Sequence, residues 1–360
     1  MKSSQEKGIE SLNQEFKRYE QVNKGQTYHL AEKEGEDLFD DEFKIQTCDM
    51  SLFFHGGEAG KKEFARQLGE AMQSIGFAIL TGHGVDHALY DEAEKKTAEL
   101  FEKTTREERM KYHAKRFGSV NQGYFPMKET TIIHPDLVEG WVFCRRAFNM
   151  DNTDFKETDY WPRPGYEPFF RRLCLQHEGL ILPIMQSILA YLGADVHLYD
   201  KKLAKTNFGF RLNFYPPIQA EDDASGAGRM LGHEDVDLFT ILPAQSVDGL
   251  QVLNRKNMKW IRLEAPKGSI VLNTGDYMQR ITNDVLPSTT HRVSKPKNKA
   301  MNSKPRISFP MAVYVWENEI LEVLPNTGAP KYDSIDAETF HTRITSKYYG
   351  DTYADQKKPV

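Results

Sequence analysis

Two histidines and an aspartate in the second half of the chain have the types and spacing of a metal site. His233-Glu-Asp235 lies at the edge of an apolar run, and in a β-strand residues i and i+2 point to the same face. His291, in the segment STTHRV, is distant in sequence but reachable across a folded sheet. Two imidazoles and one carboxylate on one face of an octahedral metal leave three adjacent positions open. Those positions can hold a bidentate cosubstrate and O₂.

The short pattern H-x-D also occurs a second time, as His134-Pro-Asp136. This copy lies in a segment rich in turn formers, and a central proline removes a hydrogen-bond donor from any strand. His233 is therefore the better candidate. The alternative for His233 is a hydrogen-bonded pair at the surface, because so short a motif arises easily.

Two further segments offer donors for an anion. Arg306 and Ser308 share one face of the predicted strand RISFP, where a guanidinium can bind a carboxylate through two parallel hydrogen bonds. In RLNFYPP, Arg211, Asn213 and Tyr215 share another strand face. Each has a structural alternative: Arg306 as the partner of a surface acid, and Tyr215 as a residue at the edge of the core.

The elements that would position these residues change character along the chain. Apolar residues recur at three- and four-residue spacing from 60 to 75, which predicts a helix, and 76–82 reads as a buried strand. Asp86 can cap a second helix. Pro168 suits the first turn of a long helix, which Pro183 can kink and Gly193 can end.

After Asn207 the pattern changes to short β-rich runs separated by turn residues. So many runs in little over a hundred residues predict a β-sandwich or barrel. The break from Asn254 to Asn257 suits a hairpin, and 336–349 is expected to form an outer helix.

Composition excludes several classes of protein. The formal charge of −5, without a long basic block, argues against a nucleic-acid partner. The sequence contains no run of about 18 apolar residues, so no membrane-spanning helix is expected. Cys48, Cys144 and Cys174 are too far apart for a C-x-x-C zinc site, and their odd number argues against a disulfide framework. A cytoplasmic protein with reduced thiols is expected.

Together the motifs resemble the isopenicillin N synthase-like family of 2-oxoglutarate/Fe(II)-dependent dioxygenases. The resemblance covers roughly residues 43–350 and rests on the segments GFAILTGHGV, NQGYFP, HPDLVEGWVF, GHEDVDLFTIL, GLQVL, GSIVLNTGDYMQR, LPSTTHRV and RISFP. It implies a distorted double-stranded β-helix, or jelly roll, with a helical N-terminal region. The implied cofactors are Fe(II), 2-oxoglutarate and O₂, and the implied reaction oxidises a small organic molecule with release of succinate and CO₂.

By resemblance, His233, Asp235 and His291 bind the iron, while Arg306 and Ser308 hold the distal carboxylate of 2-oxoglutarate, assisted by Asn213 and Tyr215. The family pattern also places Tyr124, Trp141 and Phe143 near the substrate, and Arg211 or Arg145 could meet a substrate carboxylate. The aromatic residues equally suit the core, and Arg211 equally suits a surface charge. The segment 295–304 departs from the family by its length and basic composition, which predict a surface excursion.

The expected organisation has five parts. They are a charged N-terminal extension (1–42), an N-terminal dioxygenase-type region (43–165), a long helix and connector (166–206), the jelly-roll core (207–320) and a C-terminal helical segment (321–360). Two other functions are compatible with this fold: an Fe(II)/O₂ oxidase that uses no 2-oxoglutarate, and a small-molecule binding protein without catalysis.

Overall fold

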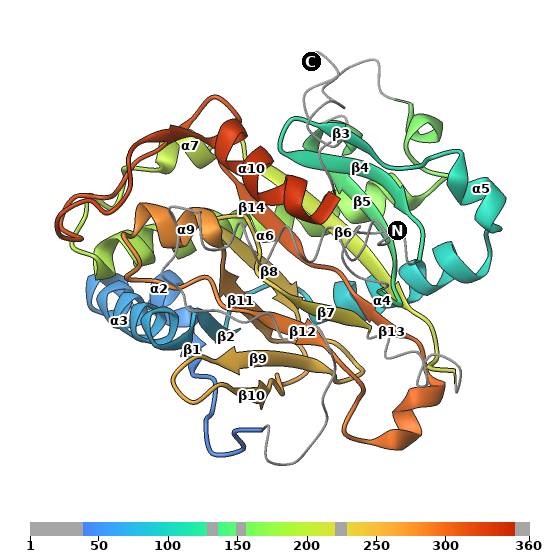
Figure 1. The fold of residues 1–360 in the computed structure, drawn as a ribbon, viewed down its shortest axis with the longest axis horizontal. Helices are drawn as coiled ribbons and strands as arrows, with labels where there is room; N and C mark the ends of the chain where they lie inside the picture. The colour runs from blue at the N-terminus through green and yellow to red at the C-terminus, as the bar shows by residue number, and fades with distance from the viewer. Residues whose placement is uncertain (1–38, 128–135, 149–155, 220–228, 350–360) are drawn as a thin grey trace, which may run out of the picture.

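Two β-sheets form the centre of the computed structural model, which describes residues 39–127, 136–148, 156–219 and 229–349 (Figure 1). Apolar side chains of both sheets pack together, with Phe77 and Val271 from one sheet meeting Leu250, Val252 and Ile261 from the other. This arrangement is the jelly roll expected from the sequence, because burying one face of each sheet requires the two to face each other.

The larger sheet has ten strands within the described residues. Its order is β1-β2-β11-β8-β14-β6-β5-β4-β3, with β13 also paired to β6, so strands from the first half of the sequence flank strands from the second half. The strands are β1 (Thr47–Asp49), β2 (Phe77–Thr81), β3 (Lys115–Phe117), β4 (Val120–Phe125), β5 (Glu139–Cys144), β6 (Asn207–Tyr215), β8 (Phe239–Pro243), β11 (Ile270–Thr274), β13 (Arg306–Ser308) and β14 (Met311–Tyr314).

The smaller sheet has the order β10-β9-β12-β7. Its strands are β7 (Met230–His233), β9 (Leu250–Asn254), β10 (Lys259–Arg262) and β12 (His291–Val293). The predicted hairpin is confirmed, because β9 and β10 pair antiparallel with Asn254 opposite Lys259. A further short ribbon joins β15 (Ile320–Leu321) to β16 (Ile335–Asp336).

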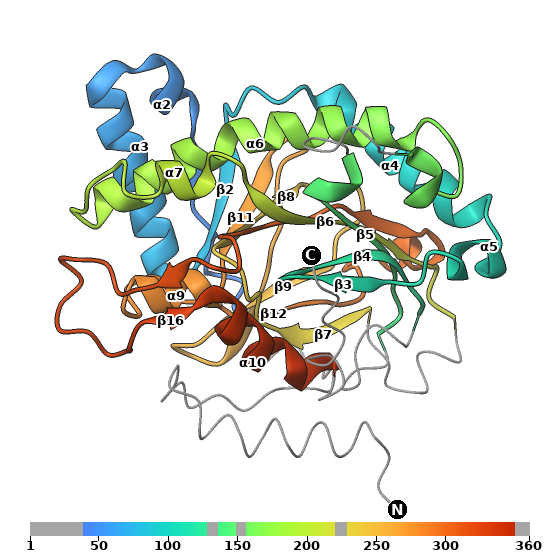
Figure 2. The ribbon, with the colours of Figure 1, turned by 90° about the horizontal axis from the view of Figure 1, so that it is seen from above.

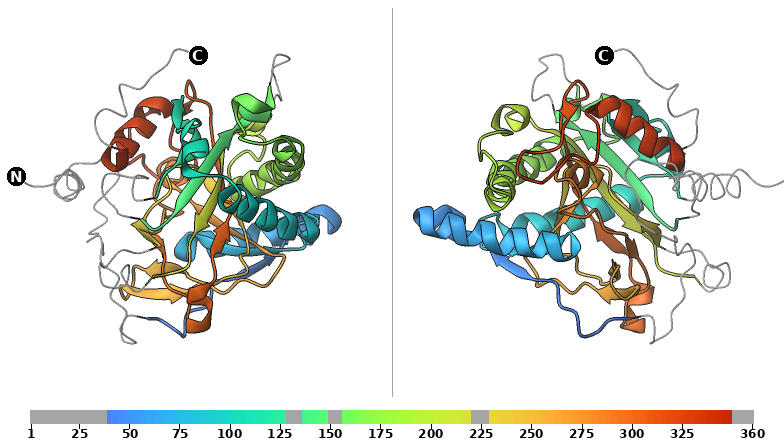
Figure 3. Two further views of the ribbon diagram at one scale, coloured as in Figure 1. Left: turned by 90° about the vertical axis from the view of Figure 1, so that its right-hand side faces the viewer. Right: turned by 60° about the vertical axis from the view of Figure 1, so that its left-hand side comes forward.

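Helices cover the sheets on two sides. Figure 2 shows α6 along one side and α10 on the other, and both views of Figure 3 agree. The helices are α2 (Ser51–His55), α3 (Gly57–Ile75), α4 (His87–Glu102), α5 (Arg106–Met110), α6 (Tyr166–Tyr191), α7 (Asp200–Leu203), α9 (Asp276–Ile281) and α10 (Ala337–Tyr349), with 3₁₀ turns at η2 (Arg145–Phe148), η3 (Glu157–Asp159) and η4 (Lys299–Ser303).

The residues predicted to cap, interrupt and end helices lie at the expected positions. The Asp86 side chain accepts a hydrogen bond from the Ala88 backbone and so caps α4. Pro183 lies inside α6, and Gly193 adopts a left-handed φ of 68° just beyond its end. Within the described residues, α6 is also the helix that is long and apolar enough to cross a membrane. Its buried residues belong to the protein core, which is the usual reason for such a composition.

The end of the acidic N-terminal stretch is tied to the hairpin of the smaller sheet. Asp40 accepts hydrogen bonds from Asn254 (2.9 Å) and Asn257 (2.7 Å), and Asp41 pairs with Arg262 at 2.8 Å. Residues 1–38, most of the expected N-terminal extension, lie outside the described residues. Cys48, Cys144 and Cys174 are free and buried.

Candidate metal centre and its cavity

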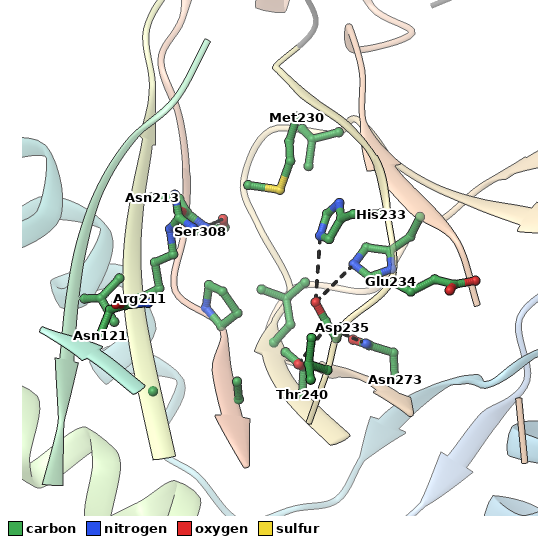
Figure 4. Close-up of a pocket in the computed structure, with 18 of the residues that line it drawn as sticks. Asn121, Arg211, Asn213, Met230, His233, Glu234, Asp235, Thr240, Asn273 and Ser308 are labelled. Carbon is green, nitrogen blue, oxygen red and sulfur yellow. Dashed lines mark hydrogen bonds and ion pairs between the residues drawn. The ribbon is translucent and has the colours of Figure 1, made fainter. Parts of the chain in front are cut away.

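His233, Asp235 and His291 converge where β7 meets β12. His291 lies directly opposite His233 in the antiparallel pairing, and the two imidazole rings are 4.3 Å apart between centroids. The Asp235 Oδ1 atom lies 3.7 Å from His233 Nε2 and 3.9 Å from His291 Nε2. One ligand atom from each residue therefore falls within 4.8 Å of the others, close enough to bind one metal ion (Figure 4).

Neighbouring groups aim two of these side chains. Asn273 and Thr240 each donate a 2.8 Å hydrogen bond to Asp235 Oδ2, which leaves Oδ1 facing the histidines. His291 Nδ1 lies 3.1 Å from the Thr289 carbonyl oxygen. Because a carbonyl can only accept, Nδ1 donates this hydrogen bond, so the neutral form of His291 keeps its lone pair on Nε2. The donor set therefore fits a divalent transition metal that prefers nitrogen and oxygen ligands.

The electrostatics of the cluster also suit a cation. Burial alone would raise the pKa of Asp235, but His291 and His233, with the two hydrogen bonds to Oδ2, hold it below its usual value. At neighbouring Asp237, burial and the charge of Asp235 raise the pKa well above its usual value. Asp235 is therefore the carboxylate of this pair that carries the negative charge.

The predicted anion seat is assembled by strand pairing. β13 runs antiparallel to β6, with Arg306 opposite Tyr215 and Ser308 opposite Asn213, so the four side chains gather at one place. Arg306 is 1% exposed and donates to the Val247 carbonyl (3.2 Å) and the Gln245 side chain (2.8 Å), while its Nη1 has no hydrogen-bond partner among the described residues. Asn213 donates to Ser308 Oγ at 3.3 Å.

A cavity of about 250 Å³ joins the metal cluster to the anion seat. The alternating positions of β6, which are Gly209, Arg211, Asn213 and Tyr215, all line it, as the shared face predicted. Figure 4 shows Arg211 and Asn213 on one side of the cavity and His233 and Asp235 on the other. The intervening residues of β6 pack into the core instead.

Three residues expected near the substrate lie elsewhere. Tyr124, Trp141 and Phe143 belong to the buried core, where Trp141 and Phe143 pack against Trp161. None of the three is among the described residues that line the cavity. Alternation along β5 instead turns Val142 toward the cavity.

Of the second H-x-D motif, only Asp136 is among the residues that the structure describes. His134 falls outside the described residues, whereas Asp136 is buried and lines the cavity. Sequence reasoning missed Asn273 and Thr240, which position Asp235. The available signal was a polar residue at an inward position of an otherwise apolar strand, because such a residue needs a partner in the interior.

Two family models match the chain. The N-terminal domain of the non-haem dioxygenase of morphine synthesis matches residues 45–164, and the 2OG-Fe(II) oxygenase superfamily matches residues 206–313. Together they cover more than half of the chain.

Several known proteins are similar over most of their length. A 2-oxoglutarate-Fe(II) type oxidoreductase, ppzC of Metarhizium majus, is 28% identical over 81% of this chain and 84% of its own. Isopenicillin N synthase of Streptomyces clavuligerus is 25% identical over 79% and 88%.

Among solved structures, a putative 2OG-Fe(II) oxygenase from Caulobacter crescentus is 26% identical, with a TM-score of 0.70 over 86% of this chain and 99% of that one. A full-length Neurospora crassa protein, solved in complex with alpha-KG and thymine, is 23% identical, with a TM-score of 0.73 over 88% and 99%, and so shares the fold. With the two family models, these matches show that the chain belongs to the isopenicillin N synthase-like family of 2-oxoglutarate/Fe(II)-dependent dioxygenases.

Proposed function

We propose that His233, Asp235 and His291 bind the Fe(II) of this 2-oxoglutarate-dependent oxygenase. The observation that carries the proposal is the convergence of their three ligand atoms within 4.8 Å. Asp235 Oδ2 accepts a hydrogen bond from Asn273 and His291 Nδ1 donates one to Thr289, which leaves Asp235 Oδ1 and His291 Nε2 available to bind the metal. Two imidazoles and one carboxylate form the facial set that leaves coordination positions open for small ligands.

We further propose that Arg306 pairs with the distal carboxylate of 2-oxoglutarate. Its unpartnered Nη1 supports this role, because a guanidinium buried to 1% exposure needs an anion or another acceptor. Ser308 and Tyr215 stand beside it through the β13–β6 register and can add hydroxyl donors. Asn213 orients Ser308 through their hydrogen bond.

The protein's share of the chemistry is position and exclusion of water. When bound, Fe(II) and 2-oxoglutarate supply the O₂-dependent oxidation of the substrate, with release of succinate and CO₂. Leu242, Leu250, Val293 and Phe77 give the cavity apolar walls beside the metal cluster. These walls limit competing reactions with water. A cavity of about 250 Å³ suits a small organic substrate rather than a macromolecule.

Free cysteines suit a reducing compartment such as the cytoplasm, which we propose as the location.

Anaerobic titration of Fe(II)-loaded protein with 2-oxoglutarate tests the site. We expect a visible metal-to-ligand charge-transfer band in the wild type and in His134→Ala, and no band and little iron in His233→Ala. Retained iron and a normal band in His233→Ala would overturn the ligand assignment. An iron-loaded wild type without any band would instead favour an oxidase that uses no 2-oxoglutarate.

A further inference from the structure

Arg211 is the second arginine of the cavity, and no ion pair joins it to an acid among the described residues. It projects from β6 on the same face as Asn213, and Arg306 and Arg211 are the two basic side chains among the described residues that line the cavity apart from the histidines. Arg306 belongs to the proposed 2-oxoglutarate seat. That assignment gives Arg211 no role in binding 2-oxoglutarate.

The hydrogen-bonding state of Arg211 is unusual. Its Nε and Nη2 atoms are buried and have no hydrogen-bond partner among the described residues. The guanidinium lies over the ring of Phe125, whose centroid is 5.4 Å from Arg211 Cζ. A guanidinium has five donors and cannot lose its proton, so burial without an acceptor is costly. An anionic ligand in the cavity would remove that cost.

The neighbouring strand makes room for this side chain. A Cβ atom at Gly140 of β5 would lie 2.8 Å from Arg211 Nε and 2.9 Å from Nη2, closer than real contacts allow. The absence of a side chain at Gly140 therefore lets Arg211 lie along the cavity wall against Phe125. A carboxylate bound through Nε and Nη2 would require this long side chain to turn from Gly140 into the cavity.

The position of Arg211 relative to the metal cluster suits substrate recognition. Figure 4 shows it across the cavity from His233 and Asp235, on the side formed by β4 and β6. A ligand held at Arg211 therefore extends toward the metal cluster.

We propose that the substrate is a small carboxylic acid and that Arg211 binds its carboxylate. The inference rests on the proposed function, because it presumes that Arg306 is occupied by 2-oxoglutarate. A carboxylate is the planar acceptor that matches a guanidinium through two parallel hydrogen bonds. Asp136 lines the same cavity and could instead bind the amine of a basic substrate, which is the alternative that the test must exclude.

The test uses protein loaded anaerobically with Fe(II) and saturating 2-oxoglutarate, so that Arg306 is already engaged. The probes are acetate, benzoate and 3-phenylpropanoate, each compared with its primary amide, and benzylamine. Binding is followed by the shift in melting temperature and by perturbation of the charge-transfer band. We expect at least one acid to bind about tenfold or more tightly than its amide, and Arg211→Gln to remove that preference.

Arg66→Gln is the matched control, because Arg66 is an exposed arginine on α3 that pairs with Glu63 and Glu70. It should keep the preference for the acid. The proposal is overturned if no acid binds the wild type, if acid and amide bind equally, if benzylamine binds best, or if Arg211→Gln keeps the preference.

The 2-oxoglutarate titration of the same proteins separates the two proposals. A wild type without a charge-transfer band refutes the proposed function, whereas the melting-temperature comparison of acid and amide does not depend on that band. Loss of the band in Arg211→Gln alone would place Arg211 in the 2-oxoglutarate seat and so overturn its assignment to the substrate.

Discussion

Replacing Arg306 by glutamine should weaken 2-oxoglutarate binding without removing the iron. The side chain is 1% exposed, and its Nε and Nη2 atoms are held by Val247 and Gln245. Its unpartnered Nη1 is thus the nitrogen with free capacity for the cosubstrate. One charge-assisted hydrogen bond is worth about 1.5–3 kcal/mol. At about 1.4 kcal/mol per decade, the dissociation constant for 2-oxoglutarate should rise roughly 10- to 100-fold.

The assay is the anaerobic charge-transfer titration of wild type and variant, with iron content measured on both. Burial lowers the pKa of Arg306, but a guanidinium stays protonated across the working range, so the effect should not depend on pH between about 6 and 8. Unchanged 2-oxoglutarate affinity in a folded, iron-loaded Arg306→Gln would refute the assignment of the seat. Loss of iron in that variant would show that Arg306 supports the metal cluster instead.

Three further perturbations follow from other contacts. Asn273→Ala removes a 2.8 Å hydrogen bond to Asp235 and should lower iron affinity roughly 10- to 100-fold by metal titration, whereas unchanged affinity would show that Thr240 alone suffices. Shortening the segment 295–304 should leave iron content intact, and a folded but iron-free product would contradict its interpretation as a surface excursion. Burial lowers the pKa of His177 from 6.5 to about 3. Between pH 6.5 and about 3, His177 is therefore protonated in the unfolded chain but not in the folded one. The free energy of unfolding should therefore fall as the pH falls through that window. In denaturant titrations at several pH values, His177→Gln should reduce the slope of this free energy against pH by roughly 1.4 kcal/mol per pH unit. An unchanged slope would show that His177 takes up its proton without unfolding.

Local signals in the sequence predicted the elements that position the site. The Asp86 cap, the apolar spacing before Ile75 and the turn after Asn254 each depend on near neighbours in the chain, and each has the expected structure. The shared face of β6 is also confirmed, because the period of two in a strand is fixed by backbone geometry. Pairing of β13 with β6 is not a local property: the family resemblance grouped Asn213 and Tyr215 with Arg306 and Ser308, but the strand register that joins them comes from the structure.

The period of a strand does not say which of its two faces meets the cavity, and β5 shows why. Trp141 and Phe143 share one face and Val142 lies on the other, so alternation permits either assignment. The decision depends on what packs against β5: Trp161 and Phe170 come from distant segments and form a stack that takes up the aromatic face. With that face buried, the opposite one must line the cavity, where Gly140 leaves space for Arg211. Large aromatic side chains therefore mark the core side of this strand, and the small residues mark the side that a ligand can reach.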